Sequence, residues 1–194
     1  MERADRVGGY PATRLPWSKG LTHLGIWLYY KVVILKNYRQ KIKTLENAKE
    51  EIDRVKASGH KTVFTNGCFD ILHPGHTRYL CAARELGDHL IVAVNSDQSV
   101  RAIKGEERPI QTEQTRVEML AALGCVDTVI IFDEDDPLKV IQHLLPDILV
   151  KGGDWAEDEI IGSDVVKKSG GEVKRIPFVT GFSTTDIIKK IRNR

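Results

Sequence analysis

The sequence has too few cysteines and too little net charge for two common classes of protein. Its three cysteines are an odd number without the spacing of a disulfide framework, which favours reduced thiols in a cytoplasmic protein. The formal net charge of the 194 residues is only +2, and no basic run interleaves with aromatic residues, so we expect no nucleic-acid partner. A hydrophobic content of 41% still allows a sizeable globular core.

Long hydrophobic runs are also missing. The one apolar run outside the main body, residues 25–35, is shorter than the roughly 20 residues that span a bilayer, and Lys31 interrupts it. No small-residue cleavage site follows it, so neither a membrane anchor nor a signal peptide is expected. The pattern changes near Lys41, and we predict an extension of unknown role over residues 1–40 and one catalytic domain over residues 41–194.

From Lys41 onward, predicted helices alternate with apolar runs typical of buried parallel strands. The expected strands cover residues 62–66, 89–94, 126–132, 148–150 and 172–176, and the expected helices lie between them, with a polar loop over 95–111. In the acidic run 133–136 we read a helix start, with Asp136 as N-cap and Pro137 at the first helical position, rather than a metal cluster. This alternation predicts an α/β fold, a doubly wound parallel sheet in a three-layer α/β/α sandwich.

The most informative stretch is Val63–His76, where a buried strand enters a glycine turn and then a helix. Two histidines, His73 and His76, stand at the helix start, where unpaired N–H groups and the helix dipole favour an anion. Imidazole donors there suit a phosphate whose charge grows during phosphoryl transfer. Helix capping, a zinc site that includes Cys68 and Asp70, and a Cys68 nucleophile are weaker alternatives.

A second helix start carries hydroxyl groups. Ser183 is the expected N-cap of the last helix, Thr184 and Thr185 follow it, and Gly181 before it permits close backbone approach. An ordinary cap is the alternative reading. Each candidate loop leaves the carboxyl end of a strand, where ligands of doubly wound sheets bind.

The motifs resemble a known superfamily. Residues 66–70 followed by His73-Pro74-Gly75-His76 resemble the signature of nucleotidyltransferases with an H-x-G-H motif, whereas no G-x-G-x-x-G of a dinucleotide dehydrogenase is present. Within that superfamily, residues 41–194 are similar to the adenylyltransferases of ADP-heptose synthesis. The motifs that carry this similarity are Asn95-Ser96-Asp97, Ser99-Val100-Arg101, Lys104-Gly105-Glu106, Arg108-Pro109, Leu149-Val150-Lys151-Gly152-Gly153-Asp154 and Phe182-Ser183-Thr184-Thr185-Asp186-Ile187-Ile188.

The resemblance implies that a sugar 1-phosphate attacks the α-phosphorus of ATP and releases pyrophosphate, with Mg²⁺ held through the ATP phosphates and no direct protein ligand for the metal. Catalysis is expected from His73, His76, Lys104 and Arg116. The nucleotide is expected to contact Asn66, Gly67, Cys68, Phe69, His73, His76, Gly152, Asp154, Gly181, Ser183, Thr184 and Thr185. The sugar phosphate is expected to contact Asn95, Asp97, Arg101, Lys104 and Arg108.

Two other functions stay open. A cytidylyltransferase for glycerol 3-phosphate or a similar small phosphate would share the histidines and the Ser183–Thr185 hydroxyls, and a non-catalytic nucleotide-binding regulator would share the fold. Relatives of the heptose enzymes are often fused to a sugar kinase, but only about 40 residues precede the match. We therefore expect the heptose 7-phosphate kinase to be a separate chain, and we expect a cytoplasmic homo-oligomer.

Overall fold

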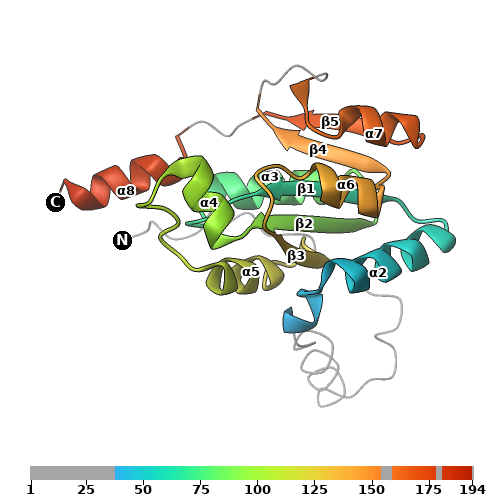
Figure 1. Cartoon of the computed structure of the whole chain (residues 1–194), viewed down its shortest axis with the longest axis horizontal. Helices are drawn as coiled ribbons and strands as arrows, with labels where there is room; N and C mark the ends of the chain where they lie inside the picture. The colour runs from blue at the N-terminus through green and yellow to red at the C-terminus, as the bar shows by residue number, and fades with distance from the viewer. Residues whose placement is uncertain (1–37, 154–158, 178–180, 194) are drawn as a thin grey trace, which may run out of the picture. The chain divides into compact units, whose positions relative to one another are not determined.

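The computed structural model describes residues 38–153, 159–177 and 181–193, and these form a parallel sheet with helices on both faces (Figure 1). Its five strands have the order β3-β2-β1-β4-β5, and all of their pairings are parallel. The bounds are β1 Thr62–Gly67, β2 His89–Asn95, β3 Thr128–Phe132, β4 Ile148–Gly152 and β5 Glu172–Ile176. The predicted doubly wound α/β fold is confirmed.

The helices begin where the sequence supplies capping side chains. A hydroxyl of Thr44, Ser96, Thr112 or Ser183 accepts a backbone N–H of the helix that it precedes, which pairs one of the donors left over at a helix start. The bounds are η1 Tyr38–Lys41, α2 Leu45–Ala57, α3 Pro74–Arg84, α4 Asp97–Lys104, α5 Glu113–Ala121, α6 Leu138–Leu144, α7 Ser163–Lys168 and α8 Thr184–Arg192.

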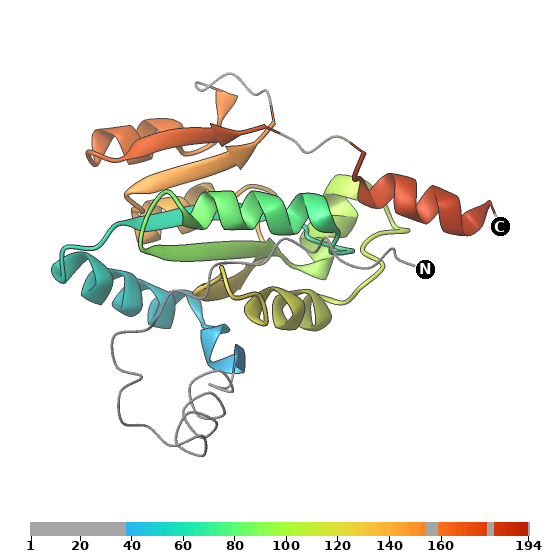
Figure 2. The same ribbon diagram turned by 180° about the vertical axis from the view of Figure 1, so that it is seen from behind.

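The side chains of successive strand residues belong to two separate apolar clusters, one on each face of the sheet. Val63 and Leu90 pack with α3 and α5, whereas Phe64 and Ile91 pack with α2, α6 and α7. Figure 2, seen from behind, shows α3 crossing in front of the sheet on the face opposite α6. Because both faces are covered, β2 is apolar between its ends, as the sequence predicted for residues 89–94, whereas the edge strand β5 carries Glu172, Lys174 and Arg175 and is mostly exposed.

Two local predictions were wrong. The expected polar loop over 95–111 contains helix α4, whose start is fixed by the Ser96 hydroxyl and whose Val100 faces the core. At the acidic run, Pro137 rather than Asp136 is the N-cap of α6, although the Asp136 carboxylate accepts the N–H of Leu138 at 2.8 Å. At residues 95–111, capping and polar residues hide a helix from a prediction based on polarity alone. At the acidic run the helix was predicted, and only the capping residue differs.

The compact unit that holds this sheet begins at Tyr38. The Tyr38 hydroxyl and the Arg39 guanidinium of η1 both donate to Glu118 on α5, at 2.6 and 2.8 Å. The predicted boundary at residue 40 and the role of the extension stay predictions. Within the described ranges, no helix is both long enough and apolar enough to cross a membrane.

Candidate functional site

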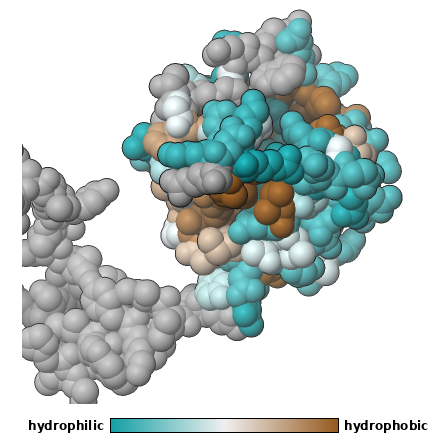
Figure 3. All heavy atoms as spheres, turned by 90° about the vertical axis from the view of Figure 1, so that its left-hand side faces the viewer, coloured by the Kyte–Doolittle hydropathy of each residue, from teal (hydrophilic) through white to brown (hydrophobic). Residues whose placement is uncertain are grey.

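The candidate site lies at the carboxyl ends of β1 and β4. From β1 the chain moves first to β2 and β3 on one side and then to β4 and β5 on the other, so the topological switch point lies between β1 and β4. Ligands of doubly wound sheets bind outside the strand ends at such a point. Figure 3 faces this edge of the sheet, and Ile103, Ile110 and Phe182 are exposed apolar side chains on the segments that leave it.

His73 and His76 stack at the start of α3. Their ring centroids lie 3.8 Å apart with an interplanar angle of 16°. His73 is the N-cap, and its Nδ1 accepts the backbone N–H of His76 at 3.4 Å, which leaves the Nε2 proton of the neutral ring as a donor. A Cβ on Gly75 would come within 2.9 Å of the His73 ring, so glycine is needed for this packing.

His76 is the less hydrated of the two rings. Burial, with a smaller effect of His73, lowers the pKa of His76 to about 4, and the Ile71 backbone only partly opposes this shift. Burial also lowers the pKa of His73. Among the described residues, no group forms a hydrogen bond with the buried Nδ1 of His76. This neutral imidazole lies at a helix start, where anions bind, and one of its nitrogens has no hydrogen-bond partner in the described residues. The ring can therefore rearrange its hydrogen bonds when an anion binds there.

Phe69 supports this arrangement from inside. Its ring contacts His76 edge-on at 5.3 Å and is 6% exposed, and it also covers Gly67. Its backbone is left-handed, with φ of 47°, which is a strained conformation for a non-glycine residue. This burial favours a role in holding His76, and the predicted contact of Phe69 with the nucleotide stays a prediction.

Cationic side chains surround the Cys68 turn, the segment that joins the end of β1 to the start of α3. Burial raises the pKa of the Cys68 thiol, while the nearby positive charges of Lys104, Arg116 and Arg108 oppose that shift. The thiol lies 4.0 Å from Oδ1 of Asn95. A buried thiol with a raised pKa is a poor nucleophile, so the geometry points to charge around this turn rather than to covalent chemistry at it.

Arg116 is fully buried, and each of its three guanidinium nitrogens donates a hydrogen bond. Its Nε donates to the Gln111 carbonyl at 3.1 Å, Nη1 to the Cys68 carbonyl at 2.6 Å and Nη2 to Oδ1 of Asp97 at 2.7 Å. The guanidinium therefore connects α5 to the Cys68 turn and to the start of α4. This arrangement suits a positioning role, and direct contact of Arg116 with phosphate stays a prediction.

Arg108 is neutralised in a similar way. Its Nε donates to Oδ2 of Asp70 at 2.6 Å, and the same buried carboxylate accepts the N–H groups of Ile110 and Gln111 at 2.8–2.9 Å. Asp70 thus anchors the loop before α5 to the β1 turn. Arg108 is already paired with a carboxylate, whereas Arg101 and Lys104 are exposed on α4.

The other residues predicted to contact a substrate differ in where they lie and in how buried they are. Asn95 is buried and donates from Nδ2 to the Ser99 hydroxyl at 3.0 Å, so much of its hydrogen bonding is satisfied inside the protein. Gly152 ends β4 close to the site, and Asp154 lies outside the described residues. Binding of the substrate by Asn95 stays a prediction.

The start of α8 lies beside the histidine pair. Phe182 faces His73 with centroids 6.4 Å apart, and the Arg78 guanidinium lies 5.3 Å from the centre of the Phe182 ring. Ser183 is the N-cap, as predicted, with its hydroxyl 3.4 Å from the N–H of Asp186. Gly181 has φ of 85°, and Thr184 and Thr185 occupy the first turn. Two helix starts therefore meet at one edge of the sheet.

The described residues do not offer a protein cage for a metal. They contain no group of three or more His, Cys, Asp or Glu side chains that could hold an ion. Both oxygens of Asp70 accept internal hydrogen bonds, and Oδ1 of Asp97 accepts from Arg116. A magnesium ion that arrives on a triphosphate needs few protein ligands, and such an ion fits this donor set better than a resident zinc.

The sequence reading missed Lys151 as a site residue. It lies near the carboxyl end of β4, half-buried, and its Nζ donates to Oδ1 of Asn66 on β1 at 3.3 Å. Burial lowers the pKa of this ammonium. A lysine inside an otherwise apolar strand, immediately before two glycines, was the signal that could have identified it.

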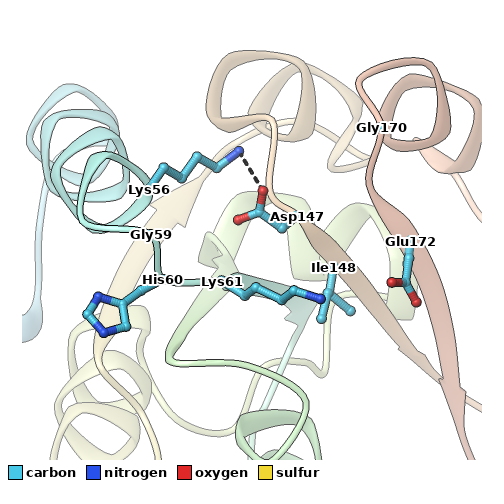
Figure 4. Close-up of a pocket in the computed structure, with 8 residues that line it drawn as sticks. All are labelled: Lys56, Gly59, His60, Lys61, Asp147, Ile148, Gly170 and Glu172. Atoms are coloured by element: carbon cyan, nitrogen blue, oxygen red, sulfur yellow. Dashed lines mark ion pairs between the residues drawn. The ribbon is translucent and has the colours of Figure 1, made fainter.

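A shallow pocket of about 300 Å³ lies at the opposite edge of the sheet (Figure 4). Two of its charged groups are paired with each other, since Lys56 lies 3.3 Å from Asp147, and Asp147 also accepts the N–H and the hydroxyl of Thr62 at 2.8 and 2.7 Å. This pocket lies at the amino ends of the strands, away from the switch point, and its pairs hold β1 and β4 together.

The parallel sheet of order 3-2-1-4-5, with a histidine-capped helix after its central strand, defines a nucleotidyltransferase fold of the Rossmann-like type. Residues 64–190 match the sequence profile of the cytidylyltransferase-like proteins, and the chain belongs to that family.

Several curated relatives share more than half of the aligned residues. The chain is 54% identical over 156 residues to the bifunctional protein HldE of Citrifermentans bemidjiense, a match that covers 80% of this chain and 32% of the relative. With HldE of Histophilus somni it is 56% identical over 144 residues, covering 74% of this chain and 30% of the relative. The chain thus spans about a third of the length of these relatives.

Two solved structures share the fold. The lipopolysaccharide core biosynthesis protein of Thermoplasma volcanium is 32% identical, with a TM-score of 0.51, and the match covers 62% of this chain and 98% of that protein. The pantoate-beta-alanine ligase of Francisella tularensis is 18% identical, with a TM-score of 0.54 and coverage of 79% and 78%. The second match concerns the fold alone.

Proposed function

We propose that this chain transfers the adenylyl group of ATP to D-glycero-β-D-manno-heptose 1-phosphate, forming ADP-heptose and pyrophosphate for the lipopolysaccharide core. The observation that carries the proposal is the 54% identity with an HldE protein over 156 residues. The name of the Thermoplasma volcanium relative supports the same pathway. Heptose 7-phosphate kinase would act earlier in that pathway.

The proposed reaction is a direct displacement. A phosphate oxygen of the acceptor attacks the α-phosphorus, the bond to the β-phosphate oxygen breaks, and pyrophosphate leaves with the electron pair. The imidazoles of His73 and His76 would donate to the phosphate oxygens as their negative charge grows, and Lys104 would add positive charge. The α8 start, with the hydroxyls of Ser183–Thr185, would hold the triphosphate from the other side.

In the proposed reaction, magnesium would arrive bound to the phosphates of ATP. It would neutralise charge on the phosphates, and the protein groups around it would orient the triphosphate. Arg116 would act indirectly in this scheme, because it fixes the Cys68 carbonyl and the start of α4 in place.

The test is release of pyrophosphate from ATP or CTP with a panel of sugar 1-phosphates and polyol phosphates. Turnover with ATP and the heptose 1-phosphate is expected. Turnover only with CTP and glycerol 3-phosphate would replace the proposal by the cytidylyltransferase function. Tight nucleotide binding without turnover on any acceptor would favour a regulator.

A further inference from the structure

The cations around the Cys68 turn differ in whether a carboxylate neutralises them. Arg108 is paired with Asp70 at 2.6 Å and Arg116 with Asp97 at 2.7 Å. Two lysines remain, Lys104 on α4 and Lys151 on β4. Within residues 38–153, 159–177 and 181–193, no carboxylate lies within ion-pairing distance of either ammonium.

The absence of a carboxylate has a different meaning for the two lysines. Lys104 is exposed, and water can solvate its charge. Lys151 is half-buried, with a long 3.3 Å hydrogen bond to the neutral Asn66 amide as its described side-chain partner. An ammonium has three donors, and burying a charge without a counterion is costly. Such a lysine needs an anion, and the described residues do not supply one.

The position of Lys151 indicates where that anion would lie. Val63 and Phe64 of β1 pair with Ile148 and Leu149 of β4, and the hydrogen bond between Asn66 and Lys151 continues this register to the carboxyl ends. Asn66 leads directly into the Cys68 turn and the histidine-capped helix. The Gly152-Gly153 pair that follows carries no side chain, and Gly153 has φ of 99°, so a ligand can approach the backbone closely there.

We propose that Lys151 is a phosphate-binding residue of this site, whose ammonium leaves Asn66 to contact a phosphate oxygen when substrate binds. The proposal rests on the proposed function for the identity of the phosphate, which belongs either to ATP or to the acceptor. Burial also lowers the pKa of Lys151, and a bound phosphate would reverse that shift.

The experiment compares Lys151→Met and Lys151→Arg with Lys61→Met in the full chain. Lys61 precedes β1 at the opposite edge of the sheet, so its variant controls for the loss of one lysine. For each protein, calorimetry gives the affinity for ATP and for pyrophosphate, steady-state pyrophosphate release gives kcat and the KM of each substrate, and thermal unfolding checks the fold. Lys151→Gln replaces Lys151→Met if the latter does not fold.

Lys151→Met is expected to lower kcat/KM about a hundredfold. Its unfolding midpoint is expected to be unchanged or raised, because the variant removes a poorly compensated charge. Lys151→Arg is expected to restore part of the lost activity. Lys61→Met should stay within about twofold of the wild type. Weaker ATP binding in Lys151→Met would assign the contact to the nucleotide, and a raised KM for the acceptor alone would assign it to the sugar phosphate.

Lys151→Met activity and ATP affinity within about threefold of the wild type would overturn the proposal. If the wild type binds ATP without turnover and Lys151→Met weakens that binding, the phosphate contact stands and the proposed function fails. A wild-type chain that binds neither ATP nor pyrophosphate would overturn both.

Discussion

The two edges of the sheet differ in how completely their polar groups are paired. At the amino edge, aspartates accept the first N–H groups of the strands: Asp147 bonds to Thr62, and Asp127 bonds to Leu90, both at 2.8 Å. At the carboxyl edge, Nδ1 of His76 lacks a partner among the described residues, and Lys151 has only an amide. The aspartates of the first edge are paired with groups of the protein, whereas the second edge retains donors and charge for an anion.

The comparison also separates two kinds of charge within the carboxyl edge. Asp70 and Arg116 are fully engaged with backbone groups and with opposite charges, and they fix the loops in place. Among the described residues, Nδ1 of His76 has no hydrogen-bond partner, and the Lys151 ammonium has no carboxylate partner. Selection for stability alone would favour pairing these two buried groups, since unpaired buried polar groups are destabilising.

His76→Ala should give the largest effect. Because the imidazole is proposed to act most strongly on the charge of the transition state, kcat/KM for pyrophosphate release should fall about 10²–10³-fold, with ATP affinity changed only a few-fold. Stopped-assay kinetics and calorimetry measure the two quantities. Equal losses in affinity and turnover would mean that His76 binds only the ground state.

Asp70→Asn should destabilise the fold. The buried carboxylate, with its side chain 0% exposed, neutralises Arg108 and accepts two backbone N–H groups, so the free energy of unfolding should fall by about 3 kcal/mol. Denaturant unfolding measures the change. A loss below about 1 kcal/mol would show that the loop before α5 does not depend on this anchor.

Asp147→Asn should affect stability without affecting catalysis. Burial alone would raise the pKa of Asp147, but the Thr62 donors and Lys56 together lower it, so the stability that the carboxylate contributes is present above its ordinary pKa and is lost as the pH falls. At about pH 7, the variant should lose roughly 1 kcal/mol of unfolding free energy. A large loss of turnover instead would mean that the amino edge takes part in function.

The pH dependence of stability should carry the signature of His76. Its folded pKa of about 4 is below its ordinary value, so between these two values the unfolded chain binds more protons and the stability falls as the pH falls. Because the ring is partly exposed, the contribution should be only about 1–2 kcal/mol. The free energy of unfolding of the wild type and of His76→Gln, measured from about pH 7 to about pH 4, gives this contribution. If both proteins lose the same stability as the pH falls, the low pKa of folded His76 would be contradicted.

The sequence was sufficient for the sheet, because unbroken apolar runs such as 89–94 and the caps at Thr44 and Ser183 have local causes. It failed at 95–111, where Ser96 and Val100 form a helix despite the surrounding polar residues. At the site, motif spacing indicated the histidines, but the pairing of Arg108 with Asp70 depends on contacts between distant segments. The need of Lys151 for a counterion likewise emerges only when β1 and β4 lie side by side.

The difference between the two edges can be tested most directly by mapping ATP on the protein. In a titration of the isotope-labelled chain with ATP and Mg²⁺, backbone amide resonances should shift most at residues 66–76, 151–153 and 181–186, and those around Lys56, Lys61 and Asp147 should stay in place. Shifts concentrated at the amino edge, with the α3 start unchanged, would contradict the assignment of the site to the carboxyl ends of β1 and β4.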